Sequence, residues 1–142
     1  MVRKSNKNID YKIIKILENN SRIKYTRLGK ILGISEAAVR KKISKLMKEG
    51  IIKKFTVEVD WKHLNMNLAI IGFDACPEKI DEIILSVKNF PNIKKFYFTS
   101  GDHDFLIFIT YHNKNDLTKF IKKLKKTEGI KKVCPAVLIE EI

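Results

Sequence analysis

The chain has 142 residues, of which 44% are hydrophobic and 32% charged, enough to build one ordinary domain or two small ones around a buried core. This composition excludes a disordered, collagen-like or low-complexity chain. The longest uncharged apolar run is about eight residues, so no membrane span is expected. Residues 1–5 lead into polar residues rather than into the apolar segment of a secretory signal, so export is not expected either. We therefore expect a soluble cytoplasmic protein.

The distribution of charge gives the first indication of a partner. Lysine and arginine number 29 and aspartate and glutamate 16, so the net charge is +13. Residues 1–60 carry 16 basic and 6 acidic side chains, whereas residues 61–142 carry 13 and 10. A general bias towards lysine does not explain why the excess lies in the first part, and we expect that part to contact a polyanion such as DNA.

Apolar spacing predicts two helices near the start of the chain, and a glycine and a serine predict the turn after the second helix. Ile9, Ile13, Ile16 and Leu17 fall on one face of a helix that ends near residue 20. A short second helix is expected over residues 26–32, with its apolar residues turned inward (Leu28, Ile31, Leu32). Gly33 can then adopt the left-handed conformation that ends a helix, and Ser35 is a good N-cap for a third. This pattern predicts a helix-turn-helix.

The third helix is expected to run to residue 49, and its two faces differ sharply. The inward stripe consists of Val39, Ile43, Leu46 and Met47. The outward face is basic with small residues between, and its members are Ala37, Arg40, Lys41, Ser44, Lys45 and Lys48. A helix in a major groove needs small side chains for close approach and cations for bases or phosphates, while Ser35 can offer its hydroxyl to a phosphate. The alternative is a solvated basic face.

After Gly50 the apolar residues Phe55, Val57 and Val59 alternate with polar ones, which predicts a strand over residues 54–59. Such a strand would form the wing of a winged helix-turn-helix, with Lys53 and Lys54 near the DNA backbone. We therefore expect a DNA-binding domain over residues 1–60 and a second domain over 61–142. Trp61 and Leu64 are candidate packing anchors in the link between them.

Short strands and helices alternate from residue 68 onward in the order β-α-β-β-α-β, which predicts a ferredoxin-like domain and places the protein in the α+β class. Strands are expected at 68–76, 93–100, 104–111 and 133–140. One helix follows Pro77, and the other ends near Gly129. The first and last strands are antiparallel neighbours in this topology, so we expect Cys76 and Cys134 to lie close together as free thiols. Pro135 restricts the last strand to an edge or a bulge.

The ferredoxin-like fold covers only one face of its sheet with helices. The segment 105–109 is nevertheless apolar at every position, and 68–71 and 136–139 are similarly apolar. The simplest cover for the second face is the sheet of another chain related by a two-fold axis. We therefore expect a homodimer, which also suits paired half-sites on DNA.

Several stretches resemble the Lrp/AsnC family of prokaryotic transcription regulators. They are residues 9–14, 20–22, 28–35, 46–52 and 99–104, in the order of that family and over nearly the whole chain. The resemblance implies a winged helix-turn-helix, a C-terminal ligand-sensing domain, dimers through facing sheets that often assemble into octamers, and amino acids as frequent effectors.

The resemblance also implies positions for the two sites. DNA would be contacted by Ser35, Ala37, Arg40, Lys41, Ser44 and Lys45, and the effector by Ser100, Gly101, Asp102 and Asp104. A carboxylate in this turn would hold an amino acid's ammonium group, while backbone N–H groups would hold its carboxylate. The alternative is a β-hairpin turn that needs glycine for a positive φ and aspartate for local capping.

Two other functions are less well supported. Relatives of the family include haem-pathway (siroheme) decarboxylases with the same two-domain plan, but His63, His103 and His112 show no metal-ligand or nucleophile–base spacing. No enzyme activity, metal or cofactor is therefore expected. A metabolite-sensing module that no longer binds DNA would have a neutral or acidic third helix, whereas the third helix here is basic.

Overall fold

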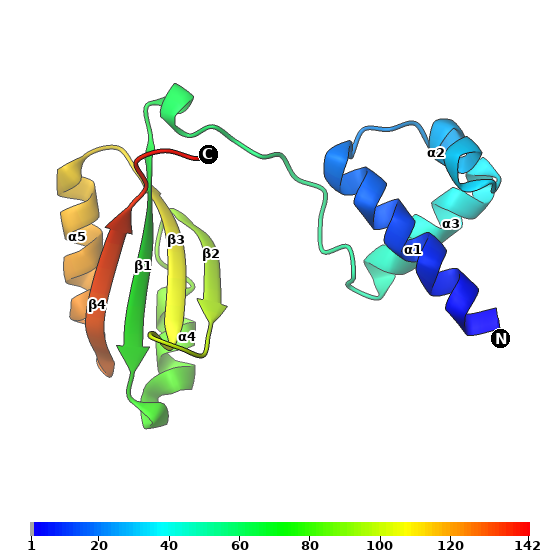
Figure 1. Ribbon diagram of the computed structural model, residues 1–142. Helices are drawn as coiled ribbons and strands as arrows, with labels where there is room; N and C mark the ends of the chain where they lie inside the picture. Colours follow the sequence, from blue (N-terminus) through cyan, green and yellow to red (C-terminus); the bar gives the residue numbers. More distant parts are fainter. Residues whose placement is uncertain (1) are drawn as a thin grey trace. The chain divides into compact units, whose positions relative to one another are not determined.

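The computed structural model describes the backbone of residues 2–142 and the side chains of residues 8–142. The chain divides into two compact units, Met1–Glu58 and Val59–Ile142 (Figure 1). In the part of the chain that is described, no helix is both long and apolar enough to cross a membrane.

The first unit is built from three helices, α1 (Val2–Asn19), α2 (Tyr25–Leu32) and α3 (Glu36–Lys48). Its core consists of Ile13, Leu17, Leu28, Val39, Ile43 and Leu46, all buried. Gly33 has a φ of 69° and ends α2, as predicted. Gly29 allows α2 to approach the turn closely, because a Cβ there would lie 2.6 Å from the carbonyl oxygen of Ile34. The predicted helix-turn-helix is confirmed.

Two residues predicted to point inward do not do so. Ile31 is 57% exposed and Met47 is 44% exposed. Three helices alone enclose only a small core, so apolar residues at the margins of each stripe remain in contact with solvent.

The predicted wing strand is absent. Residues 53–60 have no regular secondary structure, and Val57 in this segment is 78% exposed. Strand geometry requires hydrogen bonds to a neighbouring strand, and in the described chain none pairs with this segment. The alternating pattern supplies the side chains of a strand but not its partner.

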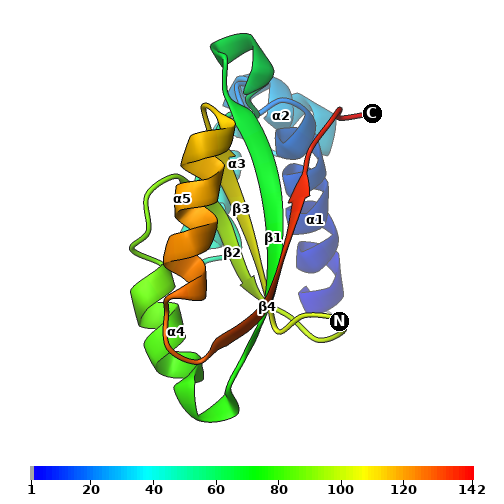
Figure 2. The same cartoon turned by 90° about the vertical axis from the view of Figure 1, so that its left-hand side faces the viewer.

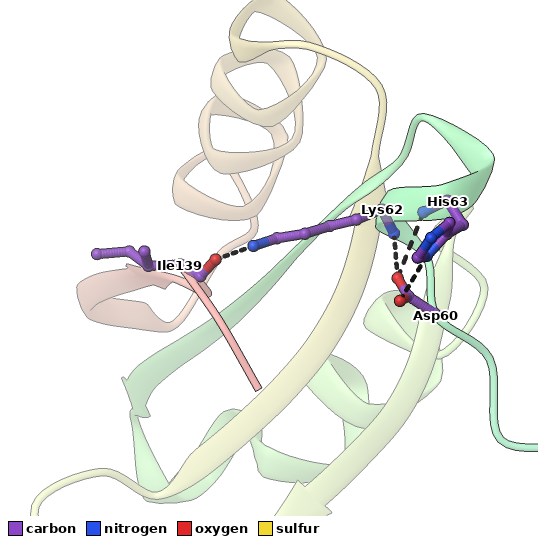
Figure 3. A network of polar contacts seen from close by, with 4 residues as sticks. All are labelled: Asp60, Lys62, His63 and Ile139. Atoms are coloured by element: carbon purple, nitrogen blue, oxygen red, sulfur yellow. Dashed lines mark hydrogen bonds and ion pairs between the residues drawn. The ribbon is translucent and has the colours of Figure 1, made fainter. Parts of the chain in front are cut away.

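The second unit begins with a network of polar contacts (Figure 3). The carboxylate of Asp60 accepts the N–H of Lys62 at 3.0 Å and lies 2.6 Å from Nδ1 of His63, at the start of the 3₁₀ turn η1 (Lys62–Leu64). The hydrogen bond from His63 lowers the pKa of Asp60 below its ordinary value. The ammonium of Lys62 donates to the carbonyl of Ile139, which joins the beginning of this unit to its end.

The second unit has the predicted β-α-β-β-α-β order. Its elements are β1 (Asn67–Ala75), the short turn η2 (Pro77–Lys79), α4 (Ile80–Val87), β2 (Ile93–Phe98), β3 (Phe105–Tyr111), α5 (Lys114–Lys125) and β4 (Ile130–Val137). The sheet is antiparallel with strand order β2-β3-β1-β4. Both helices cover one face of it (Figure 2), where Ile71, Phe73, Ile107, Ile83 and Leu124 form part of the core.

The last strand starts earlier than predicted, at Ile130 rather than residue 133. Cys134 therefore lies opposite Gly72, which is part-way along β1. Cys76 follows the end of β1 and donates its N–H to the carbonyl of Gly129 at 2.8 Å. Four residues of strand separate these levels, roughly 13 Å. The predicted closeness of the two free thiols is wrong, although β1 and β4 are antiparallel neighbours. Pro135 lies in an edge strand, as predicted.

Candidate nucleic-acid interface and effector turn

Helix α3 is stabilised at both ends by local interactions. The Oγ atom of Ser35 accepts the N–H of Ala38 at 3.1 Å, so Ser35 is the predicted N-cap. Glu36 lies in the first turn, and Lys45 and Lys48 lie in the last, which matches the helix dipole. These local interactions determine where α3 begins and where it ends.

The outward face of α3 presents the predicted DNA-contacting residues together. Ser35, Ala37, Arg40, Lys41, Ser44, Lys45 and Lys48 are all exposed. Lys53 and Lys54 are exposed as well, but they lie in the irregular segment after the helix. The structure thus groups seven of the nine residues on α3 and its N-cap and leaves two beyond the helix.

Side-chain contacts distinguish the cations of this helix from one another. Arg40 donates to Glu36 at 3.0 Å, and its guanidinium lies 5.2 Å from the ring centroid of Tyr25. Lys45 lies 3.7 Å from Glu49. Lys42 pairs with Asp10 at 3.1 Å and joins α3 to α1. This last pair has no signal in the sequence, because local spacing does not connect residues 32 positions apart.

The candidate effector turn connects β2 to β3. Thr99 closes it by donating its N–H to the carbonyl of Asp104 and its hydroxyl to the carbonyl of His103, both at 2.7 Å. Ser100, Gly101 and Asp102 are exposed at its tip, and Gly101 has a φ of 134°. The Asp104 carboxylate accepts the N–H of Ala75 at 2.9 Å. Three of the four predicted residues therefore lie at the tip of the turn, and the fourth, Asp104, is hydrogen-bonded to β1.

A polar cluster beside this turn was missed at the sequence level. Nδ1 of His103 lies 3.0 Å from Oδ1 of Asp74, whose other oxygen lies 3.7 Å from the ammonium of Lys132. The hydrogen bond to His103 lowers the pKa of Asp74 below its ordinary value of 3.8, and Lys132 adds to this effect. The His103 ring lies over Gly72, where a Cβ would be 2.3 Å from Cδ2. In the sequence, the glycine at position 72 inside an apolar strand is the feature that indicates such a close approach.

The face of the sheet opposite the helices carries apolar side chains beside the polar cluster of His103 and Asp74. Ile70, Leu106 and Phe108 are half-buried there, and Tyr97 of β2 packs edge-on against Phe108 with 5.9 Å between ring centroids. Cys134 and Ala136 of β4 are exposed on the same face. Apolar side chains of this face therefore occur on all four strands, with the His103 ring over Gly72 among them.

The three histidines have separate local environments. His63 contacts Asp60, His103 contacts Asp74, and His112 is exposed after β3. Within residues 8–142, no group of three or more His, Cys, Asp and Glu side chains is arranged to hold a metal ion.

Comparisons with known proteins agree with both units. Residues 7–53 match the family described as winged helix-turn-helix DNA-binding, and residues 68–142 match the Lrp/AsnC ligand binding domain. The HTH-type transcriptional regulator LrpA of Pyrococcus abyssi (strain GE5 / Orsay) is 39% identical over 132 residues, which cover 92% of this chain and 94% of that protein. The crystal structure of PH0061 has a TM-score of 0.87 at 25% identity and covers 94% of this chain and 93% of its own.

A further solved structure shares the fold. It is the complex of the transcriptional regulator NMB0573 from Neisseria meningitidis with L-Met, with a TM-score of 0.81 at 19% identity over 94% of this chain and 90% of that one. The two matched families together span most of the sequence and include both predicted functions. The chain belongs to the Lrp/AsnC family and is a DNA-binding transcriptional regulator with a ligand-sensing domain.

Proposed function

We propose that this regulator binds its operator as a homodimer, using the outward face of α3, and that an amino acid bound at the β2–β3 turn modulates the binding. In this proposal residues 1–60 contact DNA, and residues 61–142 hold the effector and the dimer interface. The observation that carries the DNA part is the grouping of seven predicted contact residues, all exposed, on and at the start of one capped helix.

The apolar open face of the sheet supports the dimer. A soluble monomer rarely exposes a continuous apolar surface, and a two-fold axis buries the same surface on both chains. Phe108, Leu106 and Ile70 would form the centre of this interface. Four such dimers assembling further would give the octamers that the resemblance implies.

The effector part rests on the tip of the turn. Ser100, Gly101 and Asp102 are exposed and carry backbone N–H groups suited to a carboxylate, while the Asp102 carboxylate suits an ammonium group. Asp104 would contribute through its second carboxylate oxygen, since one oxygen accepts the N–H of Ala75. The regulator NMB0573, which has the same fold, was solved with L-Met.

Selection of bound fragments from random duplex DNA, with and without each of the common amino acids, tests the whole proposal. We expect one enriched motif with two related halves, and a change in affinity with one class of amino acid. Binding should weaken steeply as salt rises, because lysines release counterions from phosphates. A flat dependence on salt would contradict the electrostatic basis of the proposal.

Two substitutions separate base contacts from phosphate contacts. Arg40→Ala should relax the selected motif at one position, whereas Lys53→Ala should weaken binding to all duplexes by a similar factor and reduce the salt slope by about one. If both variants change affinity uniformly, Arg40 contacts only the backbone.

A further inference from the structure

Arg40 is held from two sides by residues of different elements. It is the fifth residue of α3, and its Nη2 atom donates to Oε1 of Glu36, one helical turn earlier, at 3.0 Å. Its guanidinium carbon lies 5.2 Å from the ring centroid of Tyr25, the first residue of α2. Among the described cations on the outward face of α3, only Arg40 has both a carboxylate and an aromatic partner.

These contacts restrict the side chain without consuming its hydrogen-bonding capacity. A guanidinium has five N–H donors, and the bond to Glu36 uses one. The side chain is still 64% exposed, so the other donors remain accessible. A long cation that is already oriented loses less rotamer freedom on docking than a free one. Such orientation benefits a planar two-point contact, whereas a phosphate can also be bound by a point charge such as that of lysine.

The geometry points to Arg40 as the residue that contacts a guanine in the operator, with Glu36 and Tyr25 as the residues that position it; this inference rests on the proposed DNA binding. The fork of arginine matches the O6 and N7 acceptors of guanine in the major groove. Recognition helices place their N-terminal part against base edges. The small neighbours Ala37 and Ser44 allow the helix to approach closely.

The charge of Glu36 allows its effect on the position of Arg40 to be separated from its effect on affinity for any duplex. A carboxylate on a DNA-facing surface repels phosphates, so by itself it weakens binding to any duplex. Removing this charge should therefore have two effects of opposite sign. Affinity for random duplex rises, while the preference for guanine over the other bases at the position of Arg40 falls. A residue with only a structural role would not separate these two quantities.

The experiment uses the full chain with the substitution Glu36→Gln and the matched control Glu49→Gln. Glu49 pairs with Lys45 at the other end of α3, so the control makes the same charge change away from Arg40. Wild-type protein first selects its motif, and affinity is then measured for that duplex, for versions with guanine replaced, and for random duplex. We expect the wild type to prefer guanine by about tenfold or more.

Glu36→Gln should reduce this preference severalfold and raise affinity for random duplex. Glu49→Gln should raise affinity for random duplex and leave the preference unchanged. Tyr25→Leu should also lower the preference, and Tyr25→Phe, which keeps the ring, should retain it. Circular dichroism checks that each variant has the helix content of the wild type, and Glu36 and Glu49 are surface residues whose exchange leaves the core intact.

Distinct results identify which idea fails. If Glu36→Gln and Tyr25→Leu both keep the full preference, or if Arg40→Ala leaves the base preferences of the motif unchanged, the assignment of Arg40, Glu36 and Tyr25 is overturned while DNA binding stands. If the wild type binds no duplex, the proposed function and this inference fail together.

Discussion

The imidazole of His103 fills the space above Gly72 on the open face of the sheet. The strand has no side chain at residue 72, and the imidazole of His103 lies in that space, held by Asp74. Glycine in a strand interior is unfavourable relative to alanine by about 0.5–1 kcal/mol, because it loses more conformational freedom on folding. The ring contact and the hydrogen bond to Asp74 offset this cost.

Gly72→Ala should destabilise the second unit by about 1–3 kcal/mol, because the added methyl group forces the ring out of place. In a His103→Ala background the same substitution should be neutral or stabilising, since the space is then free. Urea unfolding followed by the fluorescence of Trp61, the single tryptophan, measures both. An equal cost in the two backgrounds would mean that the ring does not limit this position.

Asp74 should make stability depend on pH in the acidic range. The hydrogen bond from His103 and the charge of Lys132 lower its pKa in the folded state. The ionised carboxylate therefore stabilises the fold fully above its unfolded pKa, ordinarily 3.8, and this contribution is lost as pH falls through the lower folded value. The difference in melting temperature between wild type and Asp74→Asn should be constant near pH 6 and shrink below about pH 4.

The His103→Ala background serves as the control for this pH dependence. Without the imidazole the largest cause of the lowered pKa is removed, so the effect of Asp74→Asn should vary less with acidity. An unchanged profile in that background would assign the effect to Lys132 instead.

At the scale of elements, features fixed by neighbouring residues could be predicted and those fixed by distant partners could not. Ser35 as a cap and Gly33 in the left-handed conformation follow from local chemistry, and both were predicted correctly. The strand expected at 54–59 depends on a partner that no local pattern supplies. The charged start of β4, at Lys131 and Lys132, concealed three residues of the strand. The bond between Asp74 and His103 joins residues 29 positions apart, which no periodicity reveals.

The N-cap of α3 allows helix stability and DNA contact to be separated. Ser35→Ala removes the acceptor of the Ala38 N–H and should destabilise the first unit by about 1 kcal/mol, and it should also weaken DNA binding. Ser35→Asp retains a capping oxygen, so stability should be kept, but its charge should weaken DNA binding strongly. Thermal melting by circular dichroism and affinity for the selected duplex measure the two quantities.

Asn113→Ala is the matched control for this experiment. Asn113 caps α5 in the second unit by accepting the N–H of Asp116 at 3.0 Å. Its loss should cost a similar free energy of unfolding and leave affinity for DNA unchanged. Equal loss of affinity in Ser35→Ala and Asn113→Ala would show that stability alone controls binding.

At the scale of the whole molecule, substitution by aspartate should have different consequences on the two faces of β3. Ile107 is fully buried on the face covered by α4 and α5, and its neighbour Phe108 is half-buried on the open face. The alternation of a strand assigns the two residues to opposite sides of the sheet. Whether the open face joins two chains can therefore be tested without disturbing the core.

Ile107→Asp places a charge among apolar side chains that have no partner for it, so the second unit should unfold. Phe108→Asp removes a large apolar side chain from the open face and leaves the core intact, so the chain should stay folded. If facing sheets form the dimer, two carboxylates near the symmetry axis would repel each other across a desolvated surface, and Phe108→Asp should sediment as a monomer with native circular dichroism. Weaker binding to a motif with two half-sites should follow, with binding to a single half-site retained. A wild-type monomer, or a Phe108→Asp variant that remains a dimer, would place the interface elsewhere.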